Sequence, residues 1–392
     1  MNERFIILFG CLALLVRVGF AWYATGLARS KNAAGAVLRN VLDFSVATLA
    51  FWAVGAAIFA GDAGLYFDHR GEAHYATFFH LVLVLFASSI PISAAGERSK
   101  LFPLAAVSFV VAGVIVPVAA YWAWTGFLAR LGFLDEAGAS VIHLSAGMSA
   151  LAVAVLIGPR SGKYNRDGSS NMIPGHSLPL ASVGVLIVLV AWVPYVMGAG
   201  ALHRGAGAHA ALNVLLAAAA GGLAALVASV LRYGKPDVLL IYTGLLGGLV
   251  AVTGGANLMP TGGAVAIGAI AGVVVPWAMV QLDLRMKVDD PVGAVAVHGA
   301  GGLLGTLAVA LVAPMEMDQR LRQLGVQALG ILVIALLALI ATGALLIVLK
   351  KTIGIRSKEV DEFDGLDLAE HDLNAYPDFQ QTTIKSYHLR EA

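Results

Sequence analysis

The sequence predicts an all-α polytopic membrane protein, because its residues are too apolar for an ordinary soluble protein. Of the 392 residues, 59% are hydrophobic and 12% are charged, and the mean hydropathy is +0.83. The 45 glycines fit helices that pack closely through small faces. The net charge of +1 implies no nucleic-acid partner, and the single cysteine, Cys11, excludes a disulfide framework or a thiolate metal site.

Windows of high hydropathy predict eleven transmembrane helices with short connections, which form one membrane domain over residues 1–353. The predicted spans lie near 5–26, 41–61, 76–95, 102–123, 137–158, 178–199, 208–229, 236–256, 262–281, 292–313 and 325–349. The first apolar stretch has no clear cleavage site, so we expect no cleaved signal peptide. Residues 354–392 form a polar tail.

The basic residues predict the orientation of the chain in the plasma (inner) membrane. Most of those between spans fall on one side, together with the basic residues of the tail; examples are Arg29, Lys31, Arg98, Lys100, Arg160, Lys163, Arg285 and Lys287. We therefore expect the N-terminus outside and the C-terminus in the cytoplasm. Asp43 and Asp135 lie at the edges of predicted spans, where a carboxylate can cap a helix. Arg17 lies inside the first span, and the sequence gives it no partner.

One short pattern occurs twice in the chain. Asp135 precedes His143 by eight residues, and Asp290 precedes His298 by the same spacing; in both copies small residues flank the histidine. Eight helical residues rise ~12 Å. If the two helices enter a hydrocarbon core ~30 Å thick from opposite sides, the histidines meet near its middle. The orientation predicts this opposition, with inverted five-helix repeats over about 1–158 and 178–313 followed by a final long helix.

Two facing histidines inside a membrane are a functional-site hypothesis. Neutral imidazoles can hydrogen-bond to each other, and the pair then offers an acceptor to a small amine-like solute. The alternatives are two satisfied interior histidines, or half of a metal site. No carboxylate or thiolate near His143 or His298 completes a ligand set, so we expect no metal and no cofactor. We also expect no catalytic residue, because the histidines have no nucleophile at a recognisable motif spacing.

Several collinear segments extend this pattern over nearly the whole membrane domain. They read GLARSKN (26–32), LDFSVATLAFWAVG (42–55), GERSKLFP (96–103), LGFLDEAGASVIHLSAG (131–147), KPDVLLIYTGLLGGLVAVTGG (235–255), DDPVGAVAVHGAGGLLGTLAV (289–309) and GLDLAEHDLNAYP (365–377). In these segments the chain resembles the ammonium transporter/Rhesus family. The resemblance implies a homotrimer with one narrow pore per subunit, and ammonium as the ligand. It makes His143 and His298 the twin pore histidines, Asp135 the support of the outer vestibule and Asp290 a structural cap.

The resemblance also assigns the outer recruitment site, where this chain departs from the family pattern. Trp124 matches the tryptophan of an aromatic cage that binds a cation through its π-face. The serine position of that cage reads Ala199, and the two stacked phenylalanines that gate the pore fall on Leu83 and Tyr195. Two further pore candidates are His80, which stands where glutamine is common, and Trp192.

Two functions remain open from the sequence. The first is a transporter that recruits ammonium outside and passes it over the twin histidines. The second is an ammonium sensor with the same fold and a tightened pore, which signals through its tail to a cytoplasmic signalling domain or regulatory protein. The stretch 378–392 is polar and compatible with a short helix, and it is either a linker to such a partner or a frayed tail. The resemblance favours transport, because members of the family usually transport ammonium.

Overall fold

A computed structural model of the chain describes residues 3–61, 74–203 and 207–377. These residues form helices and connections, with no β-strand among them; isolated bridges join Ser99 to Arg356 and Tyr164 to Ser170. Helices dominate because a chain in lipid must satisfy its backbone hydrogen bonds internally. The polar stretch 378–392, whose sequence is compatible with a short helix, lies outside the described residues.

Within residues 3–61 and 74–157, the chain forms five apolar helical segments, three of which include a π-helical turn. They comprise α1 (Glu3–Leu27); η1 (Ser30–Asn32), α2 (Ala33–Ala50), η2 (Phe51–Gly55) and α3 (Ala56–Ala60); α4 (His74–Ala95) and η3 (Gly96–Arg98); α5 (Leu101–Val110), η4 (Val111–Ile115), α6 (Val116–Ala120), η5 (Tyr121–Thr125) and α7 (Phe127–Leu131); and η6 (Ala139–Leu144) with α8 (Ser145–Ile157). Each overlaps one of the first five predicted spans, with ends that agree to within three residues except at the start of the second span and at the end of the fourth.

Within residues 178–203 and 207–352, the second half forms six apolar segments before the tail. They comprise α9 (Leu178–His203), α10 (Ala208–Tyr233), α11 (Val238–Thr253), α12 (Thr261–Leu284), η7 (Val295–Ala300) with α13 (Gly301–Val312), and α14 (Met317–Thr352). Among the described residues, ten helices are long and apolar enough to cross a membrane. The predicted eighth span coincides with α11, which has only 16 residues. The structure therefore gives ten long spans and one shorter apolar helix at an expected span.

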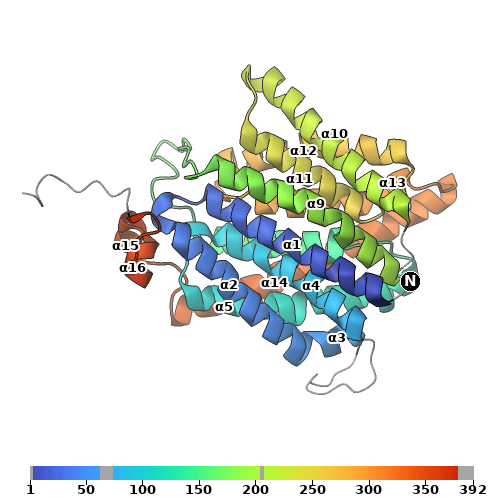
Figure 1. The fold of residues 1–392 in the computed structure, drawn as a ribbon, viewed down its shortest axis with the longest axis horizontal. Coiled ribbons are helices and arrows are strands. Elements are labelled where there is room, and N and C mark those ends of the chain that lie inside the picture. Colours follow the sequence, from blue (N-terminus) through green and yellow to red (C-terminus); the bar gives the residue numbers. More distant parts are fainter. Residues whose placement is uncertain (1–2, 62–73, 204–206, 378–392) are drawn as a thin grey trace, which may run out of the picture.

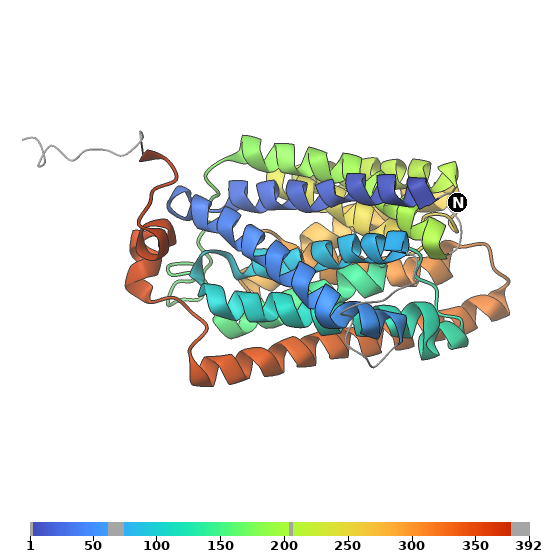
Figure 2. The same cartoon turned by 60° about the horizontal axis from the view of Figure 1, so that its bottom comes forward.

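The helices pack into one bundle with the histidine-bearing helices in its interior. α1 packs along α9, and α10 packs on α11 and α12 (Figure 1). α14, 36 residues long, runs along the edge of the bundle in Figure 2. The most buried long helices are α4 and the continuous η6–α8. A side chain that α8 or α4 turns inward is thus shielded from lipid by a ring of other helices.

The two ends of the bundle differ. Helices α15 (Glu359–Asp364) and α16 (Leu366–His371) lie at one end, which we call the tail end, and the N-terminus lies at the other, which we call the far end (Figure 1). The Asp367 carboxylate accepts hydrogen bonds from the backbone N–H groups of Ala34 and Gly35 at the start of α2, at 2.9 and 2.7 Å. The buried Glu362 accepts from the backbone of Ser161 at 2.6 Å. These bonds fix the C-terminal segment to the tail end.

The structure corrects the expectation that Asp43 caps a helix. The second span begins at Ser30, well before the predicted start near residue 41, because the polar residues Arg39 and Asn40 lower the hydropathy of its first turns. Asp43 therefore lies inside α2, where it forms a buried ion pair of 2.6 Å with Arg17 of α1. Arg17, which lacked a partner in the sequence, also donates to the backbone oxygens of Asn40, at 2.7 Å, and Leu85.

Candidate functional site

Both histidines of the repeated pattern lie in π-helical turns. His143 is in η6, which continues as α8, and His298 is in η7, which continues as α13. Such turns within α-helices often occur at functional sites. The two helices run in opposite directions, because Arg98 at the tail end donates to the oxygen of Gly158, just after α8, and to that of Asp289, before η7.

The imidazoles of His143 and His298 lie in direct contact. Their Nδ1 atoms are 3.2 Å apart, and their ring centroids are 5.2 Å apart with an angle of 20° between the planes. The side chains are 0% and 2% exposed. At this distance one Nδ1–H donates to the other Nδ1, so each ring turns its Nε2 edge away from the shared bond.

Glycines at the crossing of the two helices allow this contact, because they have no side chain. A β-carbon on Gly147 of α8 would lie 2.2 Å from the backbone nitrogen of Gly299 in η7. A β-carbon on Gly302 of α13 would lie 2.5 Å from the backbone oxygen of Ala139. The two helices therefore meet backbone to backbone, as small residues permit in membrane proteins. The small residues that flank both histidines in the sequence are thus the ones that bring the imidazoles together.

Aromatic rings surround the histidine pair. Trp192 of α9, a predicted pore candidate, stacks on His143 with centroids 5.1 Å apart, and its Nε1–H donates to the Thr253 hydroxyl at 3.0 Å. Phe86 of α4 presents its ring edgewise to both histidines, at 5.6 and 5.8 Å. Phe20 of α1 does the same to His298 at 5.7 Å. The sequence analysis did not single out Phe86 or Phe20, since no local spacing distinguishes them from other phenylalanines in spans.

Tyr195 connects this site to the segment before η6. Its hydroxyl donates to the backbone oxygen of Ala137 and lies 3.4 Å from His143 Nε2. Leu83, the other predicted gate position, is fully buried on α4. Tyr195 stands where the resemblance places a phenylalanine. Its additional hydroxyl therefore makes a hydrogen bond that joins α9 to the segment just before the His143 helix.

Asp135 caps η6 at the far end. Its carboxylate accepts hydrogen bonds from the backbone N–H groups of Gly138, Ala139, Ser140 and Val141, and from the Ser140 hydroxyl, at 2.6–3.1 Å. Burial raises the pKa of this carboxyl, and these hydrogen bonds oppose the rise. The backbone oxygen of Asp135 accepts from Trp124 Nε1 at 2.6 Å. The residues predicted as vestibule support and cage tryptophan are thus in direct contact.

A cavity of about 510 Å³ lies at the far end, outside the histidine pair. Trp124, Asp135, His80, His203 and Phe59 are among its lining residues. Three predicted recruitment residues, Leu83, Tyr195 and Ala199, are not among them, and all three are buried. His203, which the sequence analysis did not single out, stacks on Trp124 with centroids 4.1 Å apart. It lies four residues beyond the predicted span 178–199, at the end of α9, and no motif marks it.

Asp290 begins the second pattern at the tail end. Its carboxylate accepts from the backbone of Val295, the first residue of η7, at 2.6 Å, which is the arrangement of a helix cap. Burial raises the pKa of Asp290. Asp290 thus holds the start of the His298 helix as Asp135 holds the start of the His143 helix.

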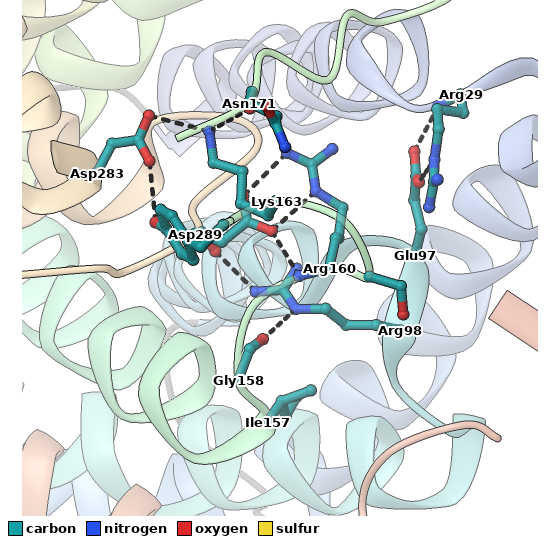
Figure 3. Close-up of polar contacts among 12 residues, drawn as sticks. Arg29, Glu97, Arg98, Ile157, Gly158, Arg160, Lys163, Asn171, Asp283 and Asp289 are labelled. Carbon is teal, nitrogen blue, oxygen red and sulfur yellow. Dashed lines mark hydrogen bonds and ion pairs between the residues drawn. The ribbon is translucent and has the colours of Figure 1, made fainter. Parts of the chain in front are cut away.

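The neighbouring Asp289 anchors the connection before η7. Figure 3 shows Arg160 and Arg98 converging on Asp289, with Lys163 paired to Asp283 beside them. Arg160 Nε and Nη2 both bond the Asp289 carboxylate at 2.9 Å. Burial acts to raise the pKa of Asp289, but the hydrogen bonds and charge of Arg160 outweigh it and lower the pKa to about 2. The backbone that positions His298 is therefore held by a buried ion pair.

Among residues 3–61, 74–203 and 207–377, no group of three or more His, Cys, Asp or Glu side chains is placed to hold a metal ion. The family model described as "Ammonium Transporter Family" matches residues 4–376. This chain belongs to the ammonium transporter family. The members of this family are transporters and not enzymes, so this family member is a multi-pass membrane protein in which we assign no catalytic residue.

Curated relatives of this ammonium transporter family member cover most of its length. The ammonium transporter Amt2 of Archaeoglobus fulgidus is 35% identical over 409 residues, which span 94% of this chain and 87% of the relative. The ammonium transporter Amt1 of Haloferax mediterranei is 30% identical, over 97% of this chain and 80% of the relative.

Solved structures share its fold. A structure named "Sensor Amt Protein" superposes with a TM-score of 0.90 at 34% identity, and covers 95% of this chain and 98% of its own. Mep2 of Candida albicans superposes with a TM-score of 0.84 at 24% identity, over 97% of this chain and 92% of its own, and supports the fold alone.

Proposed function

We propose that this ammonium transporter family member conducts ammonium or ammonia through a pore that passes the histidine pair in each subunit. The observation that supports this most directly is the contact of His143 with His298 inside a shell of Trp192, Phe86 and Phe20. In this apolar surrounding a hydrated metal cation loses more solvation than the site can replace. An ammonia molecule needs only a hydrogen-bond partner, which an imidazole edge provides.

The proposal places the far end of the bundle outside the cell and the tail end in the cytoplasm of a cell whose inner (plasma) membrane holds the protein. The excess of basic residues on the tail side supports this orientation. It includes eleven transmembrane helices with α11 as the eighth, two inverted five-helix repeats over about 1–158 and 178–313, and a tail from residue 354. We also propose a homotrimer with a pore in each subunit, which native mass spectrometry in mild detergent tests.

A second candidate function is an ammonium sensor that binds in the same pore without efficient transport. Two observations favour it: the likeness to a structure named "Sensor Amt Protein", and the Tyr195 hydroxyl bonded between α9 and the backbone of Ala137. A sensor also needs an output. The C-terminal segment, which contacts α2 through Asp367, could pass a signal to a cytoplasmic domain or regulatory protein.

Currents recorded from purified protein in liposomes on a solid-supported membrane test both candidates. For the transporter we expect a sustained wild-type current that saturates with ammonium, and for the sensor a brief binding transient alone. His143→Ala or His298→Ala should remove most of either signal, and the double variant should be little worse, because a hydrogen-bonded pair acts as a unit. His74→Ala, on the exposed first turn of α4, is the control variant. Additive losses from the two single changes would contradict a paired site.

A further inference from the structure

Two tyrosines make the same hydrogen bond on opposite sides of the histidine pair. The Tyr195 hydroxyl of α9 donates to the backbone oxygen of Ala137, six residues before the histidine of η6. The Tyr23 hydroxyl of α1 donates at 3.1 Å to the backbone oxygen of Val292, six residues before the histidine of η7. Both tyrosines are buried. Each therefore joins the first helix of one half of the chain to the segment that precedes the histidine helix of the other half.

The two hydroxyls differ in their relation to the imidazoles. Tyr195 Oη lies 3.4 Å from His143 Nε2. Among the residues that the structure describes, Tyr23 Oη bonds Val292 and makes no hydrogen bond with His298. The two rings of the histidine pair therefore have different polar neighbours, although the same backbone bond is made beside each.

The position of the Tyr195 proton follows from its partner. A backbone carbonyl can only accept, so the hydroxyl donates its single proton to Ala137. The lone pairs of the hydroxyl oxygen are then left for its other polar neighbour, His143 Nε2. A bare Nε2 would oppose its own lone pair to those of the oxygen, whereas a protonated Nε2 donates to them. Tyr195 thus favours the form of His143 that carries its proton on Nε2.

A proton on His143 Nε2 determines the rest of the pair. A neutral imidazole that is protonated on Nε2 has a bare Nδ1, which accepts. The two Nδ1 atoms are 3.2 Å apart, so the proton between them belongs to His298. His298 Nε2 is then bare, and it has no hydrogen-bond partner among the described residues. In either direction of the pair one ring is protonated on Nδ1 and the other on Nε2, so an intrinsic preference of imidazole cancels and the neighbours decide.

We propose that Tyr195 is a positioning residue that sets the direction of the histidine pair. His298 Nδ1–H donates to His143 Nδ1, and His143 Nε2–H donates to the Tyr195 hydroxyl. That hydroxyl donates to Ala137, so the hydrogen-bonded series ends on the backbone at the far end. The bare His298 Nε2 is the acceptor that the pair offers to a solute. This last step rests on the proposed function, whereas the direction of the series does not.

The direction makes the two rings unequal for a ligand. His143 Nε2 carries a proton and faces the hydroxyl of Tyr195, so it accepts nothing. Ammonium has N–H groups and no lone pair, and it therefore needs an acceptor. The structure thus favours His298 Nε2 as the atom that takes an N–H hydrogen bond from ammonium or ammonia.

Nitrogen-15 solid-state NMR of the full chain in lipid bilayers tests the direction, because protonated and bare ring nitrogens resonate far apart. The protein is labelled on histidine and measured at pH 8, above the ordinary titration range of imidazole. His143→Gln and His298→Gln assign the two rings by the signals that they remove. In the wild type we expect His143 protonated on Nε2 and His298 on Nδ1, in about five-fold excess over the reverse arrangement, as one net hydrogen bond provides.

Two tyrosine variants separate the positioning role from the packing of the ring. Tyr195→Phe keeps the ring and removes the oxygen that accepts from His143, so the two arrangements should come within about two-fold of each other. Tyr23→Phe is the matched control, because it removes the same kind of backbone bond and should leave the wild-type excess unchanged. A bare Nε2 on wild-type His143 overturns the proposal without any variant. A wild-type excess in Tyr195→Phe, or an equal change in both variants, overturns the role of Tyr195.

Addition of ammonium chloride to the same samples tests the acceptor separately. In the wild type the His298 Nε2 signal should shift and that of His143 Nε2 should not, whereas both should respond in Tyr195→Phe. Tetramethylammonium chloride has no N–H group and should shift neither. A response of His143 alone in the wild type overturns the acceptor assignment.

The two levels of proposal fail in different ways. If the rings are protonated as assigned and neither responds to ammonium, the direction of the pair stands, and ammonium binding at His298 is overturned together with the pore proposal. If the rings are protonated in the reverse order while His143→Ala still abolishes the current, the pore proposal stands and this inference is overturned.

Discussion

Gly147 and Gly299 pack against each other asymmetrically between the two helices that carry the histidines. A β-carbon on Gly147 would lie 2.2 Å from the backbone nitrogen of Gly299, a distance that forces one backbone to move. A β-carbon on Gly299 would find its nearest neighbour, the carbonyl carbon of Gly147, at 3.9 Å, which is ordinary van der Waals contact. An added methyl group therefore clashes at Gly147 but fits at Gly299.

We predict that Gly147→Ala separates the helices and disrupts the contact of His143 with His298. Overpacking of this kind costs about 1–3 kcal/mol of stability. The variant should lose most of its ammonium response and show a lower apparent Tm in detergent. Gly299→Ala is the matched control and should keep both. Equal effects of the two alanines, or a wild-type response in Gly147→Ala, would show that close backbone approach does not position the histidines.

We predict that restoring the expected gate residues changes the wild-type current only modestly if the protein is a transporter. The triple variant Leu83→Phe, Tyr195→Phe and Ala199→Ser removes the hydroxyl that donates to Ala137 and adds a ring and an oxygen acceptor. For a transporter we expect a current within about two-fold of the wild type, and for a sensor a rise of about ten-fold or more, as π and hydroxyl contacts offset dehydration. Tyr195→Phe alone shows how much of any rise comes from the lost hydroxyl. Sustained currents in liposomes, normalised to protein content, are the measurement.

We predict that the ion pair of Asp289 with Arg160 stabilises the protein above about pH 4 and stops doing so as the pH falls towards 2. The pKa of Asp289 is lowered from 3.8 to about 2, so the folded state favours its ionised form. That contribution is full above the unfolded-state pKa and is lost as the pH falls through the folded-state value. Asp289→Asn leaves the buried Arg160 without its partner and should cost about 3–5 kcal/mol.

The measurement is the apparent Tm in detergent, followed by tryptophan fluorescence between pH 2 and 6. Asp289→Asn should lower the Tm at pH 6 and flatten its dependence on pH below 4. The control is Asp167→Asn, which changes an exposed carboxylate in the same connection as Arg160. A wild-type Tm in Asp289→Asn at pH 6 would mean that Arg160 gains other partners.

The helices were predictable from hydropathy because lipid-facing and buried residues alike must be apolar. The prediction was wrong where polar residues begin a span: Arg39 and Asn40 delayed the expected start of the second helix and misplaced Asp43. The π-helical turns at His143 and His298 were not predictable, since one extra residue in a turn leaves an apolar run unchanged.

The candidate site was predictable only where its residues repeat along the chain. The duplicated spacing pointed to His143 and His298, and the structure places their rings 5.2 Å apart; their role in conduction remains a prediction. Phe86, Phe20 and His203 reach the site from helices remote in sequence, so their contacts depend on packing that local patterns do not encode.

The ion pair of Arg17 with Asp43 constrains how this protein enters the bilayer during synthesis. α1 by itself would place an arginine within a span, at a cost of about 2.5–3.5 kcal/mol on insertion scales when the charge is central. Its partner carboxylate emerges from the ribosome only with α2, which alone would carry an unpaired acid. Each charge compensates the other at 2.6 Å, so the two helices enter the lipid favourably as a hairpin and unfavourably one at a time. We therefore expect α1 and α2 to insert into the membrane together, as a pair of helices.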